Sequence, residues 1–153
     1  MASILAPILA PYSYDQISLP GRLQLPSKQH LLGTDELGRD ILSRLLYGGR
    51  VSFFVSFVVV ILSMILGVTV GLIAGFYGGW LEEVLMRLAD IFLAFPGILL
   101  AIALMAVLGP SLQNVVIALV TIGWISYARI ARSLTLKIRE LDFVRASLNL
   151  GSG

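Results

Sequence analysis

The chain has 153 residues, of which 58% are hydrophobic and 13% are charged, and its mean hydropathy is +0.93. Soluble domains contain about 45 to 50% apolar residues, so this composition excludes an ordinary soluble domain and indicates a membrane protein. A net charge of +2 is too small to indicate nucleic-acid binding, and the lack of cysteine excludes disulfides and thiolate metal sites.

The first residues, MASILAPILAPY, are apolar but too few to cross a bilayer, because a transmembrane helix needs about 20 residues. They also lack the basic region that begins a signal peptide. We expect residues 1–12 to be the end of a truncated first transmembrane helix. Pro7 and Pro11 mark the point where this helix gives way to extended chain.

Residues 13–50 are predicted to form an extracytoplasmic connection that ends in an amphipathic interfacial helix. Thr34 or Asp35 can cap this helix, because both side chains accept hydrogen bonds from the free amides of a first turn. The leucine and isoleucine side chains of the helix fall on one face and its charged side chains on the other. Gly48 and Gly49 are expected to end it.

Two polar features of this connection carry further expectations. Asp40 and Arg44 are spaced i,i+4, where they can form an ion pair worth about 0.3 kcal/mol. His30 is the only histidine of the chain, and a lone histidine in a loop is more often solvated than a ligand. We therefore predict no metal site and no catalytic residue, and GTDELGRD lacks the glycine spacing and lysine of a phosphate-binding loop.

The first full span is predicted over Val51–Phe76, in a stretch that has no charged residue. Small residues recur at every fourth position of its second half, and such a stripe lets another helix approach closely. A mere tolerance of small residues is the alternative, but each glycine costs about 1 kcal/mol in helix propensity, so we favour close packing. The small-residue stripe, our predicted helix-packing site, consists of Ser63, Gly67, Gly71 and Gly75.

A second span is predicted over roughly 88–108 and is interrupted by Pro96 and Gly97. Proline removes one backbone hydrogen bond, so we expect a hinge or bend at these two residues. Arg87 and Asp90 lie at the start of the span, where they are expected to reach the membrane interface and pair.

A third span is predicted over roughly 112–128, so that residues 51–134 hold three transmembrane helices. The chain then becomes basic, and a dense basic stretch beside a span lies on the cytoplasmic side of a membrane. Residues 135–153 are therefore expected to form a cytoplasmic loop. The basic residues of this region are Arg129, Arg132, Lys137, Arg139 and Arg145.

The closing phrase, ELDFVRASLNLGSG, predicts a short helix in this loop. Asp142 can cap its start, and residues 143–150 would form about two turns. Gly151 follows directly and can adopt the left-handed conformation that commonly ends a helix. So short a helix is marginal alone in water and needs a surface to dock on. Docking on another subunit and packing on its own chain are equally compatible with these features.

Four motifs occur in order: HLLGTDELGRDILSRLLYGGRVS, GFYGGWLEEVLMRLADIFLAFP, YARIARSLTLKIRE and DFVRASLNLG. Together they resemble the second permease subunit of ABC importers for dipeptides, oligopeptides and nickel, over essentially the whole chain. The resemblance implies an all-α, multi-pass fold like that of type I importer permeases, located in a bacterial or archaeal cytoplasmic membrane. The implied function is ATP-driven import of peptides; nickel import, or a small channel or structural role, are the alternatives.

The resemblance also implies partners and a truncation. The partners are a homologous permease, two cytoplasmic ATPase subunits that hold ATP and Mg, an extracytoplasmic substrate-binding protein and membrane lipid, and no nucleic acid. The chain itself would bind no cofactor and would not be an enzyme. The start of the family's first helix and its final helices would lie outside this chain.

The family's coupling motif is Glu-Ala-Ala followed by three residues and glycine, and it maps onto Arg145, Ala146, Ser147 and Gly151. The resemblance implies that this loop helix inserts into a groove on an ATPase subunit. Two positions depart from the motif, because Arg145 replaces glutamate and Ser147 replaces the second alanine. The implied coupling residues are Phe143, Arg145, Ala146, Ser147, Leu148 and Gly151.

Overall fold

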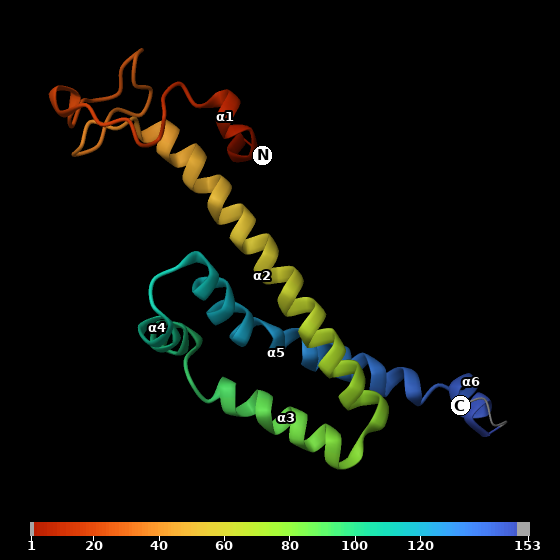
Figure 1. The fold of residues 1–153 in the computed structure, drawn as a ribbon. Helices are drawn as coiled ribbons and strands as arrows, with labels where there is room; N and C mark the ends of the chain where they lie inside the picture. Colours follow the sequence, from red (N-terminus) through yellow and green to blue (C-terminus); the bar gives the residue numbers. More distant parts are fainter. Residues whose placement is uncertain (1, 150–153) are drawn as a thin grey trace. The chain divides into compact units, whose positions relative to one another are not determined.

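The computed structural model describes residues 2–149, and these residues form helices and loops without a β-strand (Figure 1). The all-α prediction is confirmed. The described chain divides into two compact units, one up to Ser56 and one from Phe57 onward, so that α2 contributes to both. In chain order the helices are α1 (Ala6–Leu9), α2 (Ile41–Tyr77), α3 (Gly79–Leu93), α4 (Gly97–Leu108), α5 (Leu112–Arg139) and α6 (Asp142–Asn149), with 3-10 turns at Ala2–Leu5 and Leu19–Gly21.

Helices α2 and α5 are each long and apolar enough to cross a membrane. Helices α3 and α4 meet this test only as a pair, and the pair is bent by 86° where they join. By length and composition, the described residues therefore contain two candidate membrane spans, or three if the bent pair forms one span. This number agrees with the predicted polytopic membrane fold.

Residues 10–40 form an irregular loop in the first unit, and this loop folds back on itself through backbone hydrogen bonds. The amide of Thr34, for example, donates to the carbonyl of Gln24 at 3.1 Å. Gly38 has a φ of +72°, and a Cβ there would lie 1.9 Å from the carbonyl oxygen of Ser18. Only glycine fits this close approach, because it has no Cβ and tolerates positive φ.

Asp35 joins several parts of this loop. Its carboxylate accepts hydrogen bonds from the backbone amides of Leu37 at 2.9 Å and Arg39 at 3.0 Å, and from Arg39 Nε at 2.8 Å. Burial raises the pKa of Asp35, but these backbone amides and the Arg39 guanidinium outweigh it and lower the pKa to about 2. Arg44 also pairs with Asp35. The predicted Asp40–Arg44 pair is therefore wrong.

Helix α2 begins at Ile41, later than predicted, and Asp40 rather than Thr34 or Asp35 caps it. The Oδ2 atom of Asp40 accepts a hydrogen bond from the amide of Ser43 at 2.8 Å, which satisfies one free amide of the first turn. The Asp40 side chain is thereby turned toward the helix end and away from the polar face on which the i,i+4 pair was expected.

Helix α2 continues through Gly48 and Gly49, so the predicted helix end at these residues is wrong. The helix runs for 37 residues. Two glycines cost about 1 kcal/mol each in helix propensity, whereas ending a helix next to an apolar medium leaves backbone groups unpaired at several kcal/mol each. The interfacial helix and the first span are consequently one element.

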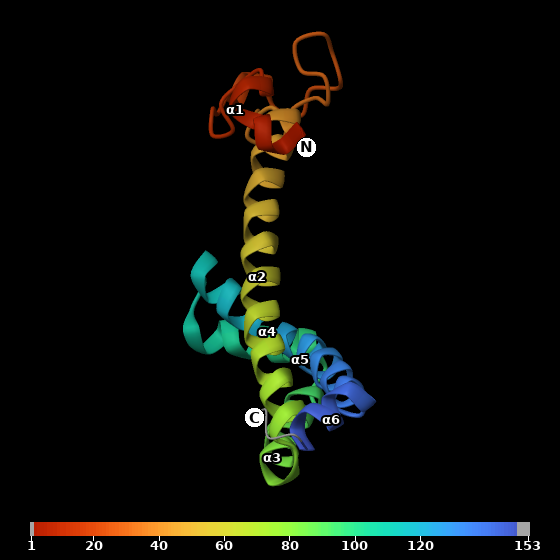
Figure 2. The ribbon, with the colours of Figure 1, turned by 90° about the vertical axis from the view of Figure 1, so that its right-hand side faces the viewer.

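In the second unit, α5 crosses the C-terminal half of α2, as Figure 1 and Figure 2 both show. Helix α5 is also longer than predicted, because the third span and the basic stretch after Ala128 form one helix. Ser111 caps its start by accepting a hydrogen bond from the amide of Asn114 at 3.1 Å. The buried apolar cluster of this unit consists of Ala89, Trp124, Ile125 and Ala128, with Val70 and Phe92 packed against it.

Acidification is expected to loosen the loop around Asp35. The folded pKa of about 2 lies below the ordinary value of 3.8, so the ionised carboxylate stabilises the fold above about pH 4, and this contribution is lost as the pH falls through 2. Hydrogen exchange at the amides of Leu37 and Arg39, corrected for the intrinsic rate, should show falling protection between pH 5 and about 2. Asp35→Asn should remove this pH dependence, and an unchanged trend in that variant would contradict the assignment.

Candidate functional site

The small-residue stripe of α2 faces α5 so closely that the two backbones touch. A Cβ added at Gly67 would lie 2.2 Å from the carbonyl oxygen of Trp124. A Cβ added at Gly71 would lie 2.3 Å from the carbonyl oxygen of Ala128. Both distances are far below van der Waals contact, so any side chain at either glycine would force the helices apart.

The two ends of the stripe also lie against α5. A Cβ at Gly75 would lie 2.7 Å from the Cβ of Thr135. At the other end, Ser63 is 1% exposed, and a Cβ at Gly123 would lie 2.6 Å from its Oγ atom. This Oγ is buried and has no hydrogen-bond partner among the described residues. Small residues of both helices thus face one another along the contact.

Helices α3 and α5 are joined by two ion pairs. Arg132 Nε donates to Glu82 Oε1 at 2.6 Å, and Arg129 Nη2 donates to Asp90 Oδ1 at 2.5 Å. Asp90 therefore pairs across to α5, while Arg87 pairs with Glu83 on its own helix. Both ion pairs between the helices connect residues far apart in the chain, and both place an acidic residue of α3 beside the basic end of α5.

Arg139, the last residue of α5, binds the C-terminal end of α2. Its Nη1 atom donates to the carbonyl oxygens of Gly75 and Phe76, each at 3.1 Å. The last carbonyls of a helix have no partner within the helix and carry partial negative charge, so an arginine there satisfies and stabilises them. The end of α5 is in this way fastened to the end of α2.

Helix α6 follows the end of α5 after Glu140 and Leu141, and Asp142 is its first residue. Phe143 is 69% exposed, and Ala146 is exposed as well. The backbone of Arg145, Ser147 and Leu148 is helical, but the structure does not describe their side chains. Gly151, the predicted C-terminal cap, lies outside the described residues.

Pro96 and Gly97, the predicted hinge, lie at the junction of α3 and α4. Helix α3 ends at Leu93, and Pro96 immediately precedes the first residue of α4. A Cβ at Gly97 would meet Ile122 of α5 at 3.4 Å. The 86° bend of the pair lies at the place where proline cannot donate a backbone hydrogen bond.

Sequence reasoning missed the partners of the charged residues. The spacing within α3 gives no sign that Glu82 and Asp90 would pair with arginines of a later helix, because such pairs depend on helix packing. The only sign in the sequence that these acidic residues would form ion pairs was their position next to an apolar span. Within residues 2–149 no group of three or more histidine, cysteine, aspartate or glutamate side chains is arranged to hold a metal ion.

The chain is similar to known proteins over nearly its whole length. Residues 67–153 match the family described as binding-protein-dependent transport system inner membrane component. A dipeptide transport system permease protein of Alkalihalophilus pseudofirmus is 46% identical over 147 residues, which is 96% of this chain and 48% of that protein. A nickel transport system permease protein of Escherichia coli K12 is 44% identical over 143 residues, covering 94% of this chain and 52% of that protein.

A glutathione transport system permease protein of Pectobacterium atrosepticum is 40% identical over 141 residues, which cover 92% of this chain and 45% of that protein. The chain thus spans about half the length of the curated relatives it matches.

Gly71→Ala is expected to lower the free energy of unfolding by about 1 to 3 kcal/mol, because the new methyl group would overlap the backbone of α5. Gly48→Ala is the matched control in the same helix, since an added Cβ there has nothing within 4 Å. That control should be neutral or stabilising by up to about 1 kcal/mol through helix propensity. Unfolding in detergent mixtures measures both, and equal effects would contradict the contact.

The Glu82–Arg132 pair is expected to contribute more stability than the Asp90–Arg129 pair. Glu82 and Arg132 side chains are 19% and 35% exposed, whereas those of Asp90 and Arg129 are 63% and 52% exposed. Double-mutant cycles with glutamine and asparagine should give a coupling of about 1 kcal/mol for the first pair and at most about 0.3 kcal/mol for the second. The reverse order would disprove this ranking.

Proposed function

Because the chain belongs to the family of binding-protein-dependent transport system inner membrane components, we propose that it is a permease subunit of an ATP-driven importer of peptides. The observation that carries this proposal is the family match from residue 67 to 153, which covers the C-terminal part of α2 and all of α3 to α6. The relatives are described as permease proteins, which indicates a transport role rather than a catalytic one. ATP and Mg would be bound by separate subunits.

Peptides are the substrate class we favour. Dipeptide and oligopeptide permeases stand among the relatives, and glutathione is itself a small peptide. Nickel is the second candidate, because the nickel permease of Escherichia coli is 44% identical to this chain. Uptake of labelled dipeptide and of nickel by cells that carry or lack the gene distinguishes the two. A channel or structural role has no support from these relatives, each of which is described as a permease.

The proposed assembly contains a homologous permease, two cytoplasmic ATPase subunits and an extracytoplasmic substrate-binding protein, all within or beside the cytoplasmic membrane. The family description supports the last of these, because it specifies transport that depends on a binding protein. The small-residue stripe would hold α2 against α5 within this chain, which leaves their other faces for lipid and for the second permease. Co-purification from membranes tests whether an ATPase subunit accompanies the chain.

Helix α6 is proposed as the contact with an ATPase subunit. It is short, and its first apolar residue, Phe143, is 69% exposed, which suits a helix that docks into a groove on another protein. Ala146 presents a small side chain that allows close approach. Arg145, Ser147, Leu148 and Gly151 are included in this proposal because of their place in the family motif.

Movement of α6 would reach the membrane helices through α5. Only Glu140 and Leu141 separate the two helices, so a push on α6 displaces the end of α5. Arg139 binds the last carbonyls of α2, and Arg132 binds Glu82 of α3, so both neighbouring helices would follow. The break at Pro96 and Gly97 would then allow α3 to move relative to α4.

Ala146→Asp is expected to reduce uptake about tenfold or more in vesicles that carry the complete importer, while membrane insertion stays normal. An unpaired carboxylate buried in a docking groove costs more than about 1.4 kcal/mol, which corresponds to a tenfold weaker contact. Ala146→Ser is the conservative control and should transport normally. Unchanged uptake by Ala146→Asp, measured beside the ATPase rate, would contradict the proposed role of α6.

A further inference from the structure

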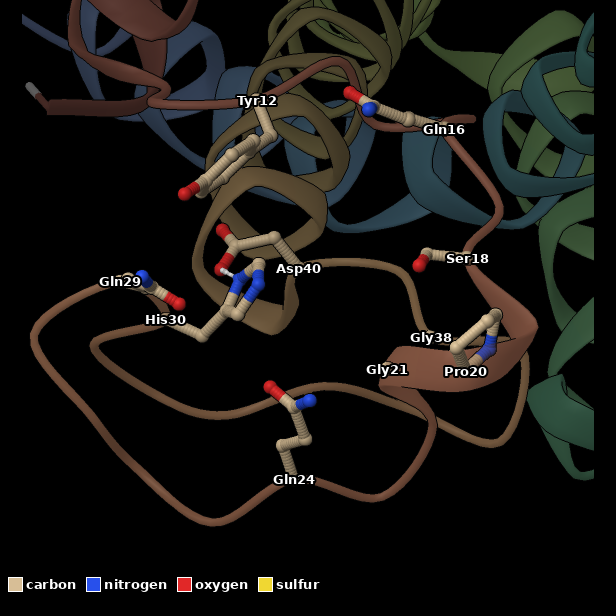
Figure 3. Close-up of a pocket in the computed structure, with 10 residues that line it drawn as sticks. All are labelled: Tyr12, Gln16, Ser18, Pro20, Gly21, Gln24, Gln29, His30, Gly38 and Asp40. Carbon is tan, nitrogen blue, oxygen red and sulfur yellow. Dashed lines mark hydrogen bonds and ion pairs between the residues drawn. The ribbon is translucent and has the colours of Figure 1, made fainter.

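The loop of the first unit lines a partly open, polar cavity that the transport proposal does not use (Figure 3). Its volume is about 340 Å³, and such a volume lies within the range of small-molecule sites. The residues that matter for the argument are Tyr12, Gln16, Gln24, Gln29, His30 and Asp40. Figure 3 shows the carboxamides of Gln24 and Gln29 directed toward the imidazole of His30.

His30 is fixed in this cavity by two neighbours. Its Nδ1 atom lies 3.0 Å from Oδ1 of Asp40, and its ring lies against the ring of Tyr12 with centroids 4.8 Å apart. The His30 side chain is 20% exposed. We expected a solvated loop histidine, but the imidazole is largely buried and is held in place by Asp40 and Tyr12. The pairing with a carboxylate fixes the orientation of the ring.

The hydrogen bond to Asp40 decides what the other ring nitrogen can do. An ionised carboxylate only accepts hydrogen bonds, so Nδ1 must donate, and in the neutral imidazole Nε2 is then an acceptor. No described residue donates to Nε2. The cavity therefore presents an oriented acceptor together with the amide oxygens of Gln24 and Gln29.

The cavity is also negatively charged. Burial raises the pKa of Asp40, but hydrogen bonds from the amide of Ser43 and from His30 outweigh it and lower the pKa, so the carboxylate is ionised near neutral pH. The Asp40 side chain is only 2% exposed. Among the described residues that line the cavity there is no lysine or arginine, so this charge is balanced only by hydrogen bonds and by the start of α2.

We propose that this cavity binds the primary ammonium group of a small organic molecule. An ammonium donates three hydrogen bonds, which His30 Nε2 and the amide oxygens of Gln24 and Gln29 can accept, and its positive charge complements Asp40. A transition metal suits the cavity less well, because His30 is its one imidazole and the two oxygens of Asp40 are already engaged. The inference does not depend on the transport function.

The single histidine of the chain makes a direct test possible, because its imidazole NMR signals need no assignment. The full chain in detergent micelles is titrated at pH 7 with glycinamide, which carries a primary ammonium, and with N-acetylglycinamide, which lacks one. We expect a saturable shift of the His30 signals with glycinamide and binding weaker by about tenfold or more with the acetylated compound, since the attraction between the ammonium and the charge of Asp40 is lost.

Asp40→Asn is the diagnostic variant. Asparagine caps a helix as well as aspartate does and keeps an oxygen for the amide of Ser43, so α2 should remain folded. Its NH2 group would then face His30 Nδ1, so the substitution removes the charge and also turns Nε2 from an acceptor into a donor. Glycinamide binding should weaken about tenfold. Asp15→Asn is the matched control, because it removes the same charge from an exposed residue of the same loop that does not line the cavity.

Three results would overturn the proposal. They are equal binding of the two amides, the absence of a saturable shift with glycinamide, and a saturable shift with nickel chloride but not with glycinamide, which would make the cavity a metal site. If Asp40→Asn fails to fold, as circular dichroism would show, the comparison of the two amides on the unsubstituted chain decides alone.

Discussion

At Gly67 and Gly71 the backbone of α2 approaches α5 so closely that a methyl group at either position would lie 2.2 or 2.3 Å from a carbonyl oxygen. In a lipid environment there is little hydrophobic driving force between helices, so such close packing is a main source of helix association. The remaining contacts of the second unit follow from this approach. Trp124 and Ala128, which lie beside the two glycines, also form the buried cluster that receives Ala89 of α3.

The basic end of α5 has a structural role that is separate from the cytoplasmic location predicted from its sequence. Arg129 and Arg132 bind acidic residues of α3, and Arg139 binds the last carbonyls of α2. These contacts lie near the ends of the helices, where charged and unpaired backbone groups gather. Close packing along the helices therefore holds their apolar faces together, while the polar contacts satisfy the charged side chains and the unpaired backbone carbonyls.

The elements that depend only on spacing along the chain were predictable. The four-residue period of Ser63 to Gly75 predicted a close helix neighbour, and Pro96 predicted the break between α3 and α4. Features that depend on tertiary contacts were not predictable. Gly48 and Gly49 suggest a helix end by local propensity, yet α2 continues through them. Asp40 was assigned to the wrong partner, because His30 and the amide of Ser43 reach it only in the folded loop.

Asp40 lies where the loop of the first unit becomes helix, and its two oxygens serve different parts. Oδ2 holds the amide of Ser43 at the first turn of α2, while Oδ1 holds His30 beside the cavity. A change in the charge on this carboxylate therefore acts on both at once. By thermodynamic linkage, a molecule in the cavity that stabilises the ionised form of Asp40 also stabilises the first turn of α2. Conversely, when that turn frays, Asp40 loses the hydrogen bond from Ser43, and its affinity for a proton rises by the same free energy.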